Sequence, residues 1–180
     1  MSVKKSGLRS CPSACPRRVA TIDIDQQPAG AGPERLVGLG FRFWMQGRAD
    51  GNIACWERAW SLYSGMFGPA RARIAVGELS GWVAALDTKA RRRIEVGRDG
   101  CGAFCRDECI AISMIAACQH NACPALRACA FALIETSEID GVAGHAQRFA
   151  DTMTSLDQVL SPASIVAAPA IARPINQLPV

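Results

Sequence analysis

The fold is decided by the stretch FCRDECIAISMIAAC, residues 104–118. Its helical pattern is apolar nearly all round, with Ile110, Ile112, Met114 and Ile115 pointing to different sides. A surface helix shows one apolar stripe and one polar face, whereas a helix that is apolar on every side is buried. We therefore predict a central helix over residues 104–118, with the other elements packed around it.

Helical spacing of apolar residues predicts further helices on both sides of this segment. They cover residues 34–47, 53–67, 69–88 and 125–136, and a last one starts near Asp140. The connections between them are short. Residues 91–96, RRRIEV, alternate and favour one short strand or an extended connector. The predicted fold is mainly α, a compact bundle of about six helices.

The two ends differ from the middle in composition. Residues 1–33 mix basic residues with prolines and predict a flexible, disordered basic tail. Residues 161–180 are apolar but broken by four prolines, and they predict a second disordered tail. The predicted helical domain is residues 34–160.

Aromatic and aliphatic residues at spacings of three and four predict the core. In residues 53–67 they form one stripe, which we expect to face inward. Over the whole domain, the residues that we expect to be largely buried are Trp56, Trp60, Leu79, Trp82, Ile112, Ile115, Phe149 and Met153.

Composition excludes several classes of protein. Among 180 residues, 49% are hydrophobic and 20% charged, which is typical of a globular domain and not of a disordered chain. No apolar run approaches the roughly 18 residues that a membrane-spanning helix needs. The first twenty residues lack the apolar core of an export signal, so we expect a cytoplasmic protein with reduced thiols.

Cysteines are the most unusual feature. Six of the nine fall within 29 residues, and His120 lies among them. Converging thiolates and imidazoles bind soft metal ions, so this cluster is a candidate site for zinc, copper or an iron–sulfur cluster. The candidate ligands are Cys101, Cys105, Cys109, His120 and Cys123.

Two other interpretations of the cysteines stay open. No C-x-x-C spacing occurs, and about 20 Å of helix would separate Cys105 from Cys118. In the interpretation that we favour, the cysteines bind no metal, and their thiols pack as small apolar side chains between closely packed helices. The third possibility is a reactive redox pair of thiols.

A basic run suggests a different kind of partner. Arg71, Arg73, Arg91, Arg92 and Arg93 give this part of the chain a positive balance that could follow nucleic-acid phosphates. No helix-turn-helix signature accompanies them. The sequence also lacks the standard hydrolase, metalloprotease and nucleotide-binding motifs, so we do not expect an enzyme.

Two blocks carry a resemblance. CWERAW, residues 55–60, and GCGAFCRDECIAISMIAACQ, residues 100–119, resemble small helical proteins of GC-rich bacteria without an assigned function. The resemblance spans residues 34–136 and supports the helical prediction alone. We therefore expect a small cytoplasmic bacterial protein that acts by binding, as an interaction or regulatory module. The alternatives are a metal- or redox-sensing protein that uses residues 101–129, and a basic nucleic-acid-binding regulator.

Overall fold

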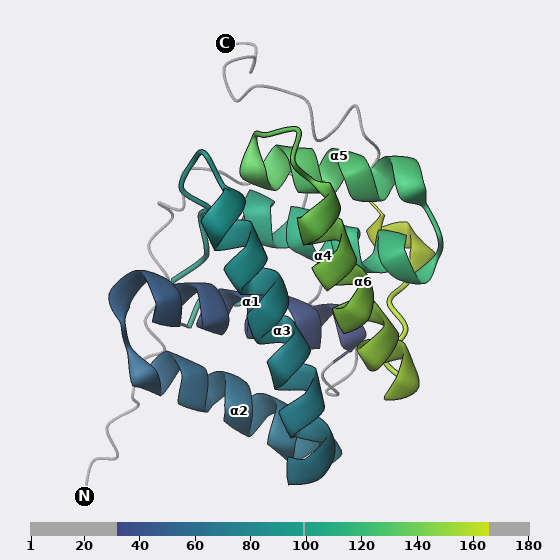
Figure 1. Ribbon diagram of the computed structural model, residues 1–180. Helices are drawn as coiled ribbons and strands as arrows, with labels where there is room; N and C mark the ends of the chain where they lie inside the picture. Colours follow the sequence, from purple (N-terminus) through teal and green to yellow (C-terminus); the bar gives the residue numbers. More distant parts are fainter. Residues whose placement is uncertain (1–31, 99, 166–180) are drawn as a thin grey trace, which may run out of the picture.

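Six helices make up the fold, as predicted. The computed structural model describes residues 32–98 and 100–165 (Figure 1). The helices are α1 (Pro33–Asp50), α2 (Ile53–Phe67), α3 (Pro69–Lys89), α4 (Arg106–Gln119), α5 (Cys123–Ile134) and α6 (Asp140–Ser155), followed by a 3-10 turn, η2 (Pro162–Ser164). No strand occurs in these two ranges, and residues 91–96 form the extended connector. In the same ranges, no helix is long and apolar enough to cross a membrane.

Local sequence explains where the helices start and stop. Proline occupies the first turn of α1, α3 and α5, where its missing N–H costs nothing. Gly68, with φ of +76°, separates α2 from α3. The predicted central helix begins two residues later than expected, because Cys105 is its N-cap and not a helical residue.

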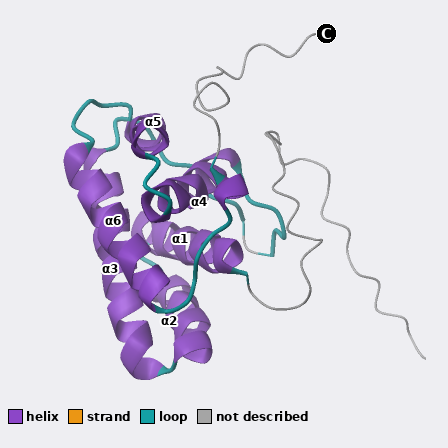
Figure 2. Ribbon diagram, turned by 90° about the vertical axis from the view of Figure 1, so that its right-hand side faces the viewer, coloured by secondary structure: helices purple, strands orange, loops and turns teal. Residues whose placement is uncertain are grey.

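Helix α4 lies at the centre of the bundle, as predicted. All twelve residues from Asp107 to Cys118 are buried. The helix packs against α1, α5 and α6, so no side is left for solvent (Figures 1 and 2). Helices α3 and α6 lie side by side along one flank, and α2 packs on α1 and α3.

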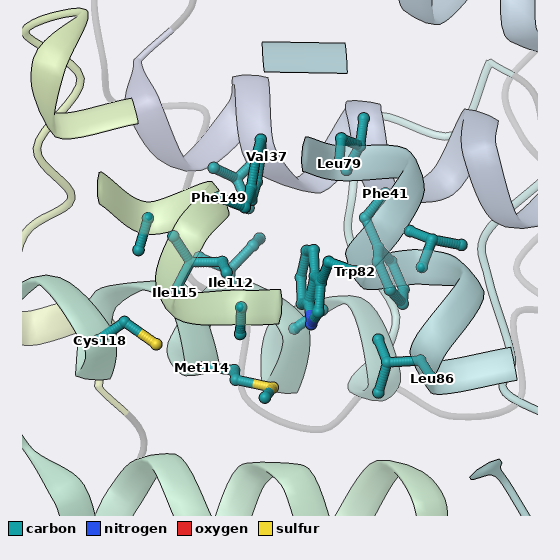
Figure 3. Close-up of a cluster of buried hydrophobic side chains, with 14 of the residues drawn as sticks. Val37, Phe41, Leu79, Trp82, Leu86, Ile112, Met114, Ile115, Cys118 and Phe149 are labelled. Carbon is teal, nitrogen blue, oxygen red and sulfur yellow. The ribbon is translucent and has the colours of Figure 1, made fainter. Parts of the chain in front are cut away.

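The core is built around Trp82 of α3. Its ring stacks on Phe149 of α6 at a centroid distance of 5.6 Å and lies 5.4 Å from Phe41 of α1 (Figure 3). Side chains of α4, including Ile112 and Ile115, complete the cluster. These contacts join four helices, which makes Trp82 the main aromatic residue of the core.

The orientation of α2 differs from the prediction. Trp60 is 38% exposed, Trp56 is only half-buried, and Ile53 is 64% exposed. The side of α2 that faces inward carries Cys55, Ala59 and Tyr63.

The physical reason is the close approach of α1 to α2. A Cβ atom on Gly40 would come within 2.5 Å of the Tyr63 hydroxyl, and one on Gly47 would collide with the Trp56 indole. These two glycines leave room on α1 for the Tyr63 and Trp56 rings, so α2 is held through that side, while Trp60 and Ile53 turn outward.

Only the tail residues next to the helical domain are among the described residues. Residues 1–31 of the predicted basic tail and residues 166–180 of the predicted C-terminal tail lie outside the described residues. Residues 161–165 are described and contact α4 through η2. Leu160, at the predicted domain boundary, is fully buried. The packed unit therefore continues past residue 160.

Stability should separate the two tryptophans. We expect Trp82→Ala to lower the free energy of unfolding by about 3–5 kcal/mol, because it removes a fully buried ring. Trp60→Ala should cost only about 1 kcal/mol, because Trp60 is already 38% exposed. Urea denaturation followed by circular dichroism measures both. Equal losses would contradict the orientation of α2.

Candidate functional site

The first turn of α4 holds a buried ion pair with α1. The Glu108 carboxylate accepts hydrogen bonds from Arg42, at 2.7 Å from Nε to Oε1 and 2.9 Å from Nη2 to Oε2. The two side chains are 0% and 2% exposed. A fork-to-fork contact of this kind is the strongest geometry available to an arginine and a carboxylate.

Both partners also fix the loop that precedes α4. Glu108 accepts the N–H groups of Gly97, at 2.9 Å, and Cys105, at 2.7 Å. Arg42 donates to the carbonyl oxygens of Cys101, at 2.7 Å, and Ala103, at 2.8 Å. A loop without strand pairing thus satisfies its backbone groups through two charged side chains.

A second ion pair lies beside the first. Arg92 donates to both oxygens of Asp107, at 2.6 and 2.9 Å, and to the Ala132 carbonyl of α5 at 2.8 Å. Asp107 also accepts the N–H of Glu95 at 2.9 Å. Glu108 thus links the loop before α4 to α1 through Arg42. Asp107 holds residues 92 and 95 of the connector, and Arg92 links the connector to α5.

Both arginines remain charged in this setting. Burial acts to lower the pKa of Arg42, but the hydrogen bonds and the negative charge of Glu108 raise it above its usual value. Hydrogen bonding to Asp107 raises the pKa of Arg92 against a smaller effect of burial. Both guanidinium groups therefore keep their proton across the physiological pH range.

The three candidate metal ligands near this end of α4 lie in different surroundings. The Cys105 thiol lies 3.2 Å from the carbonyl oxygen of Glu95, and Cys109 is buried one turn further along. Cys101 is half-buried in the loop. Burial raises the pKa of Cys105 to about 12 and that of Cys109 to about 11, with the charge of Glu108 adding to both effects. Their thiolates, the forms that bind metals and react, are therefore disfavoured.

The remaining candidate ligands lie at the opposite end of α4. His120 caps its C-terminus, and exposed Cys123 starts α5. The helix has 14 residues, so about 20 Å separates them from Cys105. Across residues 32–98 and 100–165, no three His, Cys, Asp or Glu side chains come together in a way that would hold a metal ion. Binding of zinc, copper or an iron–sulfur cluster stays a prediction.

Two further cysteines lie inside the bundle. Cys129 of α5 is fully buried, with its sulfur 3.4 Å from the Ser113 hydroxyl of α4. Cys118 is 3% exposed. Burial raises the pKa of Cys118 to about 12 and that of Cys129 to about 11. Both thiols act as small apolar side chains between helices.

The basic residues do not gather in one patch. Arg71 and Arg73 are exposed in the first turns of α3, whereas Arg91 and Arg93 are exposed just beyond its other end. The length of α3 places the two pairs about 30 Å apart. Arg92 is engaged by Asp107. Nucleic-acid binding through these five residues stays a prediction that no single surface supports.

The structure instead presents a surface that sequence reasoning missed. Ile53, Glu57 and Trp60 follow one another at spacings of four and three on α2, so they share one side, and all three are exposed. We call this surface the α2 face. The signal that could have revealed it is the pair Gly40 and Gly47, seven residues apart on α1, which leaves room for the Tyr63 and Trp56 rings of α2 and so turns Ile53 and Trp60 outward.

Comparisons with known proteins give no guide to this surface. No family model, curated protein or solved structure matches the chain. A function for this chain therefore has to be argued from its own residues.

The buried ion pair gives a test of how the site is held. Glu108→Ala should lower the free energy of unfolding by about 3–5 kcal/mol, because it leaves a buried guanidinium without its counter-charge. Replacing both partners, as Arg42→Met with Glu108→Leu, should cost much less than the sum of the single changes. Chemical denaturation of the unchanged chain, Arg42→Met, Glu108→Leu and the double variant measures this cycle. Simple additivity would show that the two groups do not act as a pair.

Thiol labelling tests the environment of the cysteines. At pH 8 a thiol with a pKa of about 12 is ionised in about one molecule in ten thousand, so native Cys105 and Cys118 should label very slowly. Exposed Cys123 should label fast. Raising the pH toward 11 should accelerate the slow thiols, and urea should abolish the difference. Alkylation followed by peptide mass spectrometry measures each site. A stoichiometric metal in anaerobically purified protein that blocks Cys105 would contradict the packing interpretation.

Proposed function

We propose that this chain acts by binding another protein, as an interaction module, and that the α2 face is its contact surface. The observation that carries the proposal is the exposure of Trp60 and Ile53 on one side of a well-formed helix. Tryptophan is among the residues that most often dominate binding energy in protein interfaces. Its ring offers a large apolar area at a small cost in conformational entropy.

The chemistry of the face defines the partner. Ile53 and Trp60 lie on either side of Glu57 along the helix. A matching partner surface offers an apolar pocket for the indole and a basic or hydrogen-bonding group opposite the carboxylate. Met66, 43% exposed near the end of α2, adds further apolar surface on the same helix.

A cytoplasmic location is part of the proposal. The seven cysteines in the described residues are all free, which agrees with a reducing compartment. The metal- or redox-sensing and nucleic-acid-binding alternatives stay predictions, since neither the separated ligands nor the separated arginines favour them.

Site-specific photo-crosslinking tests the contact surface. A photoreactive residue in place of Glu57 should give a discrete adduct with a partner protein in cells of the producing organism. The same residue in place of Arg127, 59% exposed on α5, is the matched control and should give none. Trp60→Ala should lower the yield about tenfold or more, since interface tryptophans often contribute over 2 kcal/mol. Identical adducts at both positions, or a yield that Trp60→Ala leaves unchanged, would rule out the α2 face.

A further inference from the structure

The segment after α6 turns back and lies against the bundle. We call residues 157–165 the strap; it contains η2, which contacts α4 (Figure 1). The strap has no strand or α-helix of its own. Its position therefore depends on what the bundle offers to its backbone and to its few buried side chains.

Two side chains at the end of α4 bind the strap backbone. Gln119 uses both ends of its amide: Nε2 donates to the Gln158 carbonyl at 2.9 Å, and Oε1 accepts the Leu160 N–H at 2.8 Å. His120 Nε2 lies 2.8 Å from the Leu160 carbonyl oxygen, so this nitrogen carries a proton and donates. Three backbone groups over three residues are thus bound by neighbouring side chains.

A buried carboxylate of α1 binds the next part of the strap. Glu34 is only 7% exposed, and its Oε1 accepts the Ser161 N–H at 2.7 Å and the Ser164 hydroxyl at 3.0 Å. Glu34 thereby continues the row of contacts that Gln119 and His120 begin.

One side chain of the strap acts as an apolar anchor. Leu160 is 0% exposed and belongs to the core cluster, whereas its neighbours Val159 and Ser161 are exposed. Leu160 is the most deeply inserted side chain, Ile165 packs partly against the same core, and hydrogen bonds hold the backbone beside Leu160. Recognition of extended peptides works in this way, with backbone hydrogen bonds for affinity and a side-chain pocket for specificity.

We propose that Glu34, Gln119 and His120 form a peptide-binding groove, and that the strap is its ligand supplied by the same chain. The ligand class is a peptide with a leucine and, four residues later, a serine whose hydroxyl is brought to Glu34 by a 3-10 turn. Four of the five contacts described go to backbone atoms, so another segment with the same anchor satisfies them equally. This site is separate from the α2 face and does not depend on the proposed function.

Attachment to the same chain decides when another peptide can enter. A tethered ligand acts at an effective concentration in the millimolar range, so it excludes weak free peptides. A peptide then binds only after the strap has been weakened or displaced. Weakening the anchor alone, without shortening the chain, should open the groove.

Peptide binding to the full chain tests the groove. The probe is a fluorescent peptide of residues 157–165, DQVLSPASI, added to the unlabelled full chain, with binding measured by anisotropy. Full chain with Leu160→Ala should bind it at least about tenfold more tightly than the unchanged chain does. Adding Gln119→Ala to that variant should weaken binding about tenfold, and a probe with Leu160→Asp should not bind.

The proposal is overturned if folded Leu160→Ala chain binds no peptide, because the strap is then a permanent part of the core. If the Leu160→Ala variant does not fold, amide hydrogen exchange on the unchanged chain tests the same proposal. The amides of Leu160 and Ser161 should exchange by local opening, well before those of Ile112 and Ile115 in α4. Exchange of all four only on global unfolding would equally overturn the groove.

Discussion

The carboxylate of Glu108 is the constraint on which the arrangement of this bundle depends. A charge with no exposure to water is unfavourable unless ionic and hydrogen-bonding partners surround it, and Glu108 has Arg42 on one side and two backbone N–H groups on the other. These contacts set the distance between α1 and α4. They also organise the connector, which crosses the end of the bundle with a backbone hydrogen bond to α5 from the Arg91 N–H to the Ile134 carbonyl oxygen. Helices satisfy their own backbone groups, whereas this loop depends largely on the side chains of Arg42, Glu108 and Asp107 for its shape.

The helices themselves could be predicted from the sequence because the residues that start, stop and pattern a helix lie within that helix or next to it. Apolar spacing, prolines in first turns and glycines between segments identified six helices, and the lack of a polar side identified α4 as the central one. The orientation of α2 could not be predicted in the same way, since it depends on Gly40 and Gly47 in another helix. The arginine that pairs with Glu108 lies 66 residues away, and the serines bound by Glu34 lie more than 120 residues away, beyond the reach of any local pattern.

The cysteine-rich segment shows why composition alone is an uncertain guide to chemistry. Its cysteines are close in sequence, but α4 places them at both ends of a helix and on different neighbours. Among the buried ones, low polarity and the nearby acids disfavour the thiolate. A cysteine suggests reactivity when only the sequence is considered, but its small, apolar side chain is also well suited to filling space between helices. Alanine serves the same purpose beside it at positions 116, 117 and 130.

The complete burial of α4 has a consequence for how this protein can change over evolutionary time. Twelve successive positions contact other helices, so a substitution at any of them requires an adjustment elsewhere. Substitutions in α4 are therefore coupled to the residues that pack on it. Ile53, Glu57 and Trp60 are exposed, so the packing of the bundle constrains these three positions less. The outer side of α2 can therefore vary with less effect on the packing of the bundle than any position of α4.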